Sequence, residues 1–220
     1  MLINEYLEHT RLNPDLTDKD IDELVGQAIQ YKFIGVCVPP FWVVRAKREL
    51  EKSPTNLVTV VGFPLGYQMT ETKLKECAMA IDGGADEIDL VINVSALKSG
   101  MPWVKIELAK CAALLHQSNV VLKVILETAL LSDSEIIMAS KLASDAGADY
   151  IKTSTGFSHH GAKTEHIKLI RGSIPASVGI KASGGIKSYA QCLELIEAGA
   201  SRIGASSAVK IVKESNEHEH

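Results

Sequence analysis

The chain has 220 residues, 46% of them hydrophobic and 23% charged, which is typical of a globular protein with one domain. A formal net charge of −4 argues against a nucleic-acid partner, which usually meets a basic stripe. No apolar run is long enough to cross a membrane, and the first residues lack the basic and apolar regions of a signal peptide. Four scattered cysteines without metal-site spacing predict free thiols in the cytoplasm.

Apolar alternation and turn residues predict eight short strands. They cover residues 8–12, 34–38, 57–61, 86–93, 120–127, a run centred on Lys152, 178–183 and 201–205. A helix is expected after each strand. The helices follow Thr17, then cover 41–52, 70–82, 103–116, 132–147, 163–171 and 188–198, and a last one opens at 206–207.

Strict alternation of strands and helices predicts a parallel sheet, and eight such units fit a single-domain (β/α)₈ TIM barrel over residues 1–220. The polar tail, residues 213–220, is expected to fray. The alternative is a doubly wound open sheet. Its strands would be apolar on both faces, whereas several strands here carry one polar face.

Three of the strands each contain one lysine, and Lys123, Lys152 and Lys181 recur at intervals of 29 residues. Because side chains alternate between the two faces of a strand, the apolar residues would pack on helices and the lysines would point to the opposite side. Asp89 has the same placement on the fourth strand. A lysine held near another cation loses its proton more easily and becomes a nucleophile at neutral pH.

The loops after the last three strands are rich in small residues, which let backbone N–H groups approach an anion. In barrels of this kind a phosphate site often follows strands seven and eight. The segments concerned are Thr155-Gly156, Ser183-Gly184-Gly185 and Gly204-Ala205-Ser206-Ser207. We therefore predict a phosphorylated substrate held beside a pair of lysines and a carboxylate.

Structural interpretations compete with the chemical one. A single strand lysine can simply reach solvent, and Gly184-Gly185 alone is a turn more often than a phosphate site. For Lys123 we prefer a structural ion pair with Glu87 or Glu127. Cys37 is interpreted as a core thiol. The pair His159-His160 is assigned to a loop, because no third metal ligand stands at useful spacing.

The same segments resemble deoxyribose-phosphate aldolases nearly end to end. The resemblance is carried by residues 85–93, 122–128, 149–157, 179–186 and 202–207. It implies a class I aldolase that needs no metal and no cofactor and is often a dimer or tetramer. Such an enzyme cleaves 2-deoxy-D-ribose 5-phosphate to D-glyceraldehyde 3-phosphate and acetaldehyde. By position, Lys152 would form the Schiff base, Lys181 would lower its pKa and assist proton transfer, and Asp89 would act with a water. Six small residues would line the phosphate site, namely Gly156, Gly184, Gly185, Gly204, Ser206 and Ser207.

The sequence also departs from the family pattern. Glu8 stands where the family usually has Asp, Asn13 where Lys is common, and Lys187 in place of an Arg beside the phosphate site. The segment 158–160 replaces a loop richer in glycine, and the tail lacks a C-terminal tyrosine. Rival functions are another Schiff-base aldolase, a phosphosugar isomerase that forms no imine, and a barrel that only binds a phosphorylated ligand.

Overall fold

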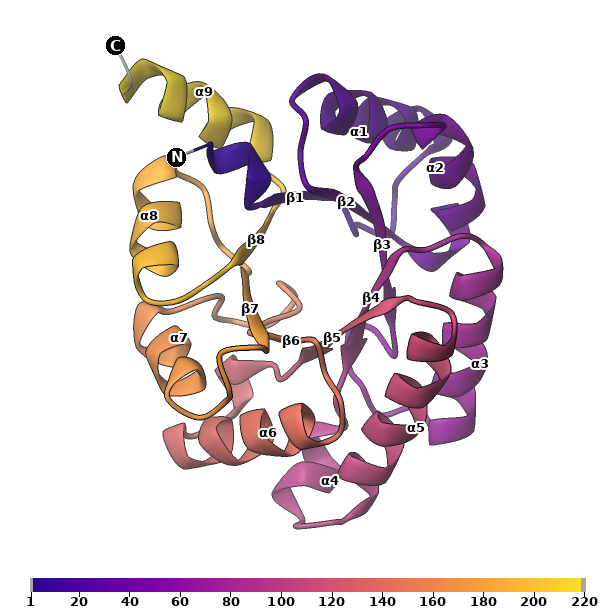
Figure 1. Cartoon of the computed structure of the whole chain (residues 1–220), viewed down its shortest axis with the longest axis vertical. Helices are drawn as coiled ribbons and strands as arrows, with labels where there is room; N and C mark the ends of the chain where they lie inside the picture. Colours follow the sequence, from indigo (N-terminus) through magenta and orange to yellow (C-terminus); the bar gives the residue numbers. More distant parts are fainter. Residues whose placement is uncertain (1, 219–220) are drawn as a thin grey trace.

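The computed structural model describes residues 2–218, and its eight parallel strands close into a barrel in chain order. Strand β1 pairs with β2 on one side and with β8 on the other, so the sheet has no edge. The helices form a ring around the strands, and the two ends of the chain lie on the same side of the molecule (Figure 1). The predicted (β/α)₈ barrel is confirmed, and the open doubly wound sheet is excluded.

The strands are β1 (Leu7–Thr10), β2 (Gly35–Val38), β3 (Asn56–Val61), β4 (Glu87–Val91), β5 (Val121–Ile125), β6 (Tyr150–Lys152), β7 (Gly179–Ser183) and β8 (Arg202–Ala205). The α-helices are α1 (Asp18–Gln30), α2 (Val43–Leu50), α3 (Thr70–Asp82), α4 (Val94–Lys98), α5 (Trp103–Gln117), α6 (Asp133–Asp145), α7 (Thr164–Arg171), α8 (Tyr189–Glu197) and α9 (Ala208–His218). Short 3₁₀ turns are η1 (Ile3–Glu5), η2 (Pro40–Trp42) and η3 (Thr128–Leu130).

Capping residues set the starts of two helices where the sequence predicts them. Thr17 precedes α1, and its backbone N–H donates to Asp20 at 2.8 Å. Ser132 precedes α6 and forms the same reciprocal pair with Glu135. Each pair satisfies N–H groups that have no partner inside the helix.

The strands expected over 8–12, 86–93 and 120–127 all end earlier in the structure, and the last helix runs further than expected. The strand predicted over 86–93 ends at Val91, because the side chain of Asn93 accepts the N–H of Ala96 at 3.0 Å and starts α4 instead. Residues 213–218, expected to fray, are helical as the second half of α9, where the buried Ser215 faces the molecule. Residues 219–220 lie outside the described part of the chain.

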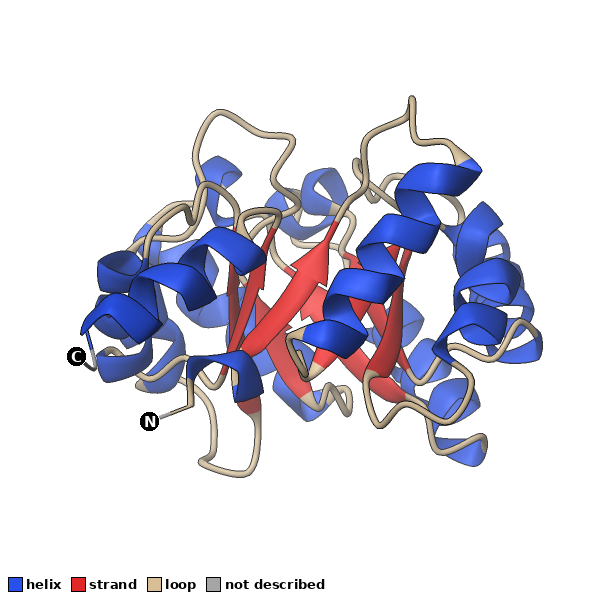
Figure 2. Cartoon of the chain, turned by 90° about the horizontal axis from the view of Figure 1, so that it is seen from above, coloured by secondary structure: helices blue, strands red, loops and turns tan. Residues whose placement is uncertain are grey.

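Strands β5 and β6 each have an apolar outer face and a polar inner face. In Figure 2 the strands run through the middle of the molecule and the helices pack around them. Leu122 and Ile151 point outward and are fully buried against this ring, while Lys123 and Lys152 point inward. The predicted division of the strand faces is therefore confirmed.

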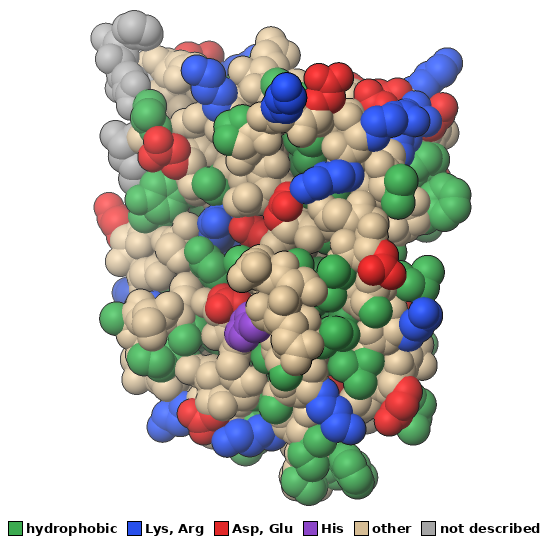
Figure 3. Space-filling model, turned by 45° about the vertical axis from the view of Figure 1, so that its right-hand side comes forward, with side chains coloured by type: hydrophobic (Ala, Val, Ile, Leu, Met, Phe, Trp, Pro, Cys, Tyr) green, Lys and Arg blue, Asp and Glu red, His purple; other side chains and the backbone are tan. Residues whose placement is uncertain are grey.

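The surface carries charges of both signs. On the face shown in Figure 3, Lys and Arg side chains are interspersed with Asp and Glu. Within residues 2–218, no helix is both long enough and apolar enough to span a bilayer.

Candidate active site

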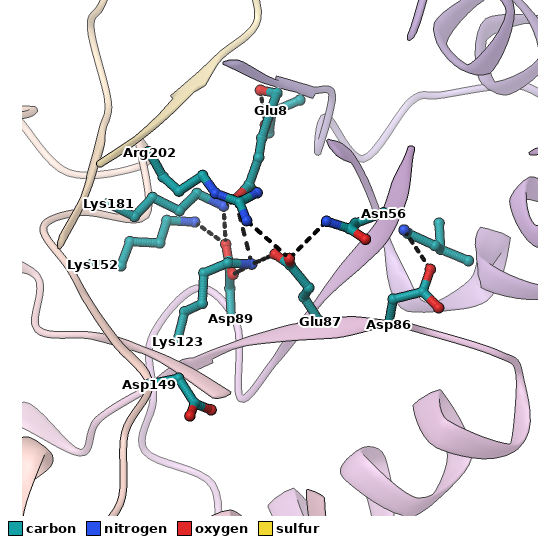
Figure 4. A network of polar contacts seen from close by, with 12 residues as sticks. Glu8, Asn56, Asp86, Glu87, Asp89, Lys123, Asp149, Lys152, Lys181 and Arg202 are labelled. Carbon is teal, nitrogen blue, oxygen red and sulfur yellow. Dashed lines mark hydrogen bonds and ion pairs between the residues drawn. The ribbon is translucent and has the colours of Figure 1, made fainter. Parts of the chain in front are cut away.

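Three lysines and one carboxylate meet inside the barrel (Figure 4). Lys152 on β6 and Lys181 on β7 both donate to Asp89 Oδ2, each at 2.6 Å. Lys123 on β5 donates to Asp89 Oδ1 at 3.0 Å. All four side chains are buried. The convergence predicted from strand alternation is therefore present, with Asp89 at its centre.

Two further carboxylates complete this cluster. Glu87 lies 2.5 Å from Lys123 Nζ, so the ion pair preferred for Lys123 forms with Glu87 and not with Glu127. Glu8, on β1, is fully buried and contacts Lys181 directly. The sequence showed Glu8 only as a departure from a family pattern. Its alternation with outward-facing Leu7 along β1 was the signal that could have placed it inside.

The charges inside the barrel are unequal in number. Among the described residues, the cations there are Lys123, Lys152, Lys181 and Arg202, and the carboxylates are Glu8, Glu87 and Asp89. Four positive and three negative groups leave one excess positive charge when all are ionised. A buried excess charge is costly. One neutral lysine restores balance.

Lys152 is the one of the three lysines whose surroundings favour the neutral form. Its pKa is lowered from the ordinary lysine value, first by burial and then by the charge of Lys181, against the opposing attraction of Asp89. Lys181 is buried too, but the attraction of Asp89 and Glu8 outweighs that cost and raises its pKa. For Lys123, burial is likewise outweighed by three carboxylates, and its pKa is raised. Asp89 resists the effect of burial because the lysines hold its pKa well below the usual value.

Desolvation, more than like charge, is therefore the main cause of the lowered pKa of Lys152. Sequence reasoning placed the emphasis on Lys181. The pattern of strand lysines carries no information on how completely each amine is removed from water, and this is set by the packing of the barrel.

A cavity of about 280 Å³ opens above this cluster. Lys152 lines it, whereas Asp89 and Lys181 lie behind. Five of the six small residues predicted for a phosphate site also line it, namely Gly156, Gly184, Gly185, Gly204 and Ser206. The sixth, Ser207, lines a neighbouring cleft that shares Ser206 with the cavity.

The small residues are required by the backbone. Gly184 has φ +89°, and a Cβ there would lie 2.9 Å from the Cα of Gly161. Gly185 has φ +74° and open space on its side-chain position. Within residues 2–218, the N–H groups of Gly185 and Ser206 donate to no protein acceptor. Together with exposed Lys187, which also lines the cavity, they form a rim suited to an anion.

Other singled-out residues have structural surroundings. Cys37 packs inside the barrel with Val58 and Val60, and burial raises the pKa of its thiol to about 11, as expected for a core thiol. The His159 and His160 rings lie 4.7 Å apart in the loop after β6. Asn13, expected as a departure, lines the cavity.

Comparison with known proteins places this arrangement in a family. The model of the DeoC/LacD family aldolases matches residues 4–213. The chain belongs to the DeoC/LacD family of aldolases. It is 48% identical over 213 residues to the deoxyribose-phosphate aldolase of Brevibacillus brevis, covering 96% of each chain. It is 46% identical over 216 residues to that of Thermococcus gammatolerans, covering 97% of this chain and 96% of the relative.

Among solved structures, the tetrameric deoxyribose phosphate aldolase of Aeropyrum pernix superposes on this aldolase with a TM-score of 0.90 at 33% identity. The match covers 98% of this chain and 91% of the other. The family likeness inferred from short segments thus extends over the whole barrel.

Proposed function

We propose that this aldolase reversibly cleaves 2-deoxy-D-ribose 5-phosphate to D-glyceraldehyde 3-phosphate and acetaldehyde through an imine on Lys152. The observation that carries the proposal is a division among three buried lysines. Lys152 has the lowered pKa and lines the cavity, whereas Lys123 and Lys181 hold their protons behind it. A neutral amine facing a cavity is a nucleophile for a carbonyl carbon.

The reaction follows from this division. The neutral Lys152 amine attacks the C1 aldehyde of the open-chain sugar, and loss of water gives a protonated imine. When the C3 hydroxyl loses its proton, a carbonyl forms at C3 and the C2–C3 bond breaks. The electron pair of the C2–C3 bond moves into the imine to give an enamine. Glyceraldehyde 3-phosphate leaves, the enamine is protonated at C2, and water releases acetaldehyde from Lys152.

Lys181 and Asp89 are the groups we assign to the proton steps. Lys181 keeps its proton and is linked to Lys152 through the same oxygen of Asp89. A proton can therefore pass between the two amines along charge-assisted hydrogen bonds, with a water completing the path to the substrate. The imine itself needs neither a metal nor a cofactor.

We assign the substrate phosphate to the rim formed by Gly156, Gly184, Gly185, Gly204, Ser206 and Ser207. Open N–H groups and the start of α9 support this assignment, since both favour an anion. Lys187 adds a point charge rather than the two-pronged contact of an arginine.

We also infer a cytoplasmic homo-oligomer. The four cysteines are free and buried, which suits a reducing compartment. Exposed Tyr67, Met69 and Trp103 form part of one apolar pocket on the outside of the barrel, and such exposed groups are typical of subunit contacts. Light scattering at micromolar concentration is expected to give a mass above that of one chain, and a monomer would contradict this inference.

The test of the reaction is chemical trapping. The protein is treated with acetaldehyde and borohydride, and its intact mass and peptide map are measured. We expect one reduced two-carbon adduct on Lys152, absent from Lys152→Ala. An adduct on Lys181 would reverse the two roles, and a folded protein without a selective adduct would refute the imine mechanism.

A further inference from the structure

Glu127 has an unusual backbone conformation at the mouth of the barrel. It directly follows Leu126 at the end of β5 and has φ +56° and ψ +63°, in the left-handed region that residues other than glycine seldom adopt. Within residues 2–218, the other such non-glycine residues are Lys32, Glu51 and Asn119, which all follow helices on the opposite rim. A strained residue at the functional end of a barrel persists when its surroundings fix it.

The carboxylate of Glu127 holds the loop after β6. It is buried, and its Oε2 accepts the hydroxyl of Thr155 and, at 3.3 Å, the N–H of the same residue. The backbone supports this contact on both sides. Leu126 N–H donates to Lys152 O at 3.0 Å, and Thr128 N–H donates to Thr153 O at 2.9 Å.

These contacts restrict what the Thr155 hydroxyl can do. A threonine hydroxyl has one proton to donate and two lone pairs. Its proton is given to Glu127, and one lone pair accepts the N–H of Phe157 at 3.1 Å. Thr155 lines the cavity, so its oxygen can meet a ligand there only as an acceptor.

We propose that Glu127 is a positioning residue that fixes Thr155 Oγ1 as a hydrogen-bond acceptor for the C4 hydroxyl of the sugar phosphate. The inference rests on the proposed function. Along the chain Thr155 lies between Lys152, which takes C1, and Gly156, which belongs to the site assigned to the phosphate on C5, and all three residues line the cavity. The position of Thr155 therefore suits the C4 hydroxyl, which is next to C5. After cleavage this hydroxyl is the 2-hydroxyl of glyceraldehyde 3-phosphate.

The test uses the reaction in the direction of carbon–carbon bond formation. Acetaldehyde is joined either to glyceraldehyde 3-phosphate or to 3-oxopropyl phosphate, which lacks the 2-hydroxyl. The unaltered protein is expected to prefer the hydroxylated acceptor by about tenfold or more in kcat/KM, because a site built for a hydroxyl leaves an unpaired oxygen with the other. Glu127→Leu is expected to reduce this preference to about twofold.

Matched variants separate positioning from folding. Glu127→Gln retains an oxygen acceptor and is expected to keep most of the preference. Thr155→Val removes the hydroxyl with little change in shape and is expected to lose the preference for the hydroxylated acceptor. This variant keeps the test available if Glu127→Leu does not fold. Asn119→Gly removes a left-handed residue on the opposite rim and is expected to behave as the unaltered protein.

Trapping with acetaldehyde and borohydride supplies the second readout. Because acetaldehyde reaches Lys152 without using Thr155, adduct formation is expected to be normal in every folded variant. The inference would be overturned if the preference for the hydroxylated acceptor survived in both Glu127→Leu and Thr155→Val. It would also be overturned if these variants lost adduct formation together with the preference. Failure of trapping in the unaltered protein would instead refute the proposed function.

Discussion

Replacing Lys181 with methionine tests how strongly this cation lowers the pKa of Lys152. Lys152 Nζ and Lys181 Nζ both lie 2.6 Å from Asp89 Oδ2, so they are at most about 5 Å apart. At an effective dielectric constant of about 20, two unit charges at this distance repel by about 3 kcal/mol. In Lys181→Met the remaining cations in the cluster equal the carboxylates, and a protonated Lys152 is then the balanced state.

The expected result is a large loss of neutral amine at pH 7. An energy of about 3 kcal/mol corresponds to roughly a hundredfold change in the ratio of neutral to charged lysine. The assay is the rate of acetaldehyde adduct formation under borohydride, measured from pH 6 to 10. The pH midpoint of this rate reports the ionisation of Lys152, whereas the size of the rate also depends on proton transfers during imine formation, in which Lys181 can take part.

The pH midpoint of adduct formation is expected to rise in Lys181→Met. Lys105→Met serves as the control, because this lysine is exposed and paired with Asp145 on the outside of the molecule. Circular dichroism establishes that the variant is folded, since removing one partner of a buried ion pair can cost about 3–5 kcal/mol. A midpoint that stays in place, or falls, would refute the electrostatic reasoning.

Three further predictions concern the phosphate rim and the buried carboxylates. Gly184→Ala places a Cβ within 2.9 Å of Gly161 Cα at φ +89°, so KM for deoxyribose 5-phosphate should rise about tenfold or more in steady-state kinetics. The effect on KM for unphosphorylated deoxyribose should be smaller, and equal effects would argue against a phosphate rim. Lys187→Arg should lower KM for the phosphorylated sugar about twofold, because a guanidinium can bind phosphate through two N–H groups. An unchanged or higher KM would show that Lys187 does not reach the phosphate. Despite burial, cations hold the pKa values of Glu8 and Asp89 below their ordinary 4.5 and 3.8. These two carboxylates should therefore contribute fully to the free energy of unfolding above about pH 5, and their contribution should fall as the pH drops through the lowered pKa values. Urea titrations measure this free energy, and a protein that gains stability on acidification would contradict the prediction.

Local sequence determined the elements of the barrel. The side-chain alternation around Leu122 and Lys123 predicts one outward and one inward face because the strand repeat is two residues. The capping pair Ser132 and Glu135 marks the start of α6 through hydrogen bonds that span only three residues. Asn93 misled the prediction, since an asparagine at the end of a strand can also cap a helix.

Only the tertiary structure decided what the three lysines become. Lys123, Lys152 and Lys181 are alike in sequence, with the same spacing and the same strand face. Asp89 contacts all three amines, whereas Glu8 is a second partner for Lys181 and Glu87 is one for Lys123. Their pKa values diverge because Lys152 therefore has the weaker compensation for burial. Contacts across as many as 173 positions of the chain follow from closure of the barrel. Local spacing supplied the charged groups, and barrel closure set which amine has the lowered pKa.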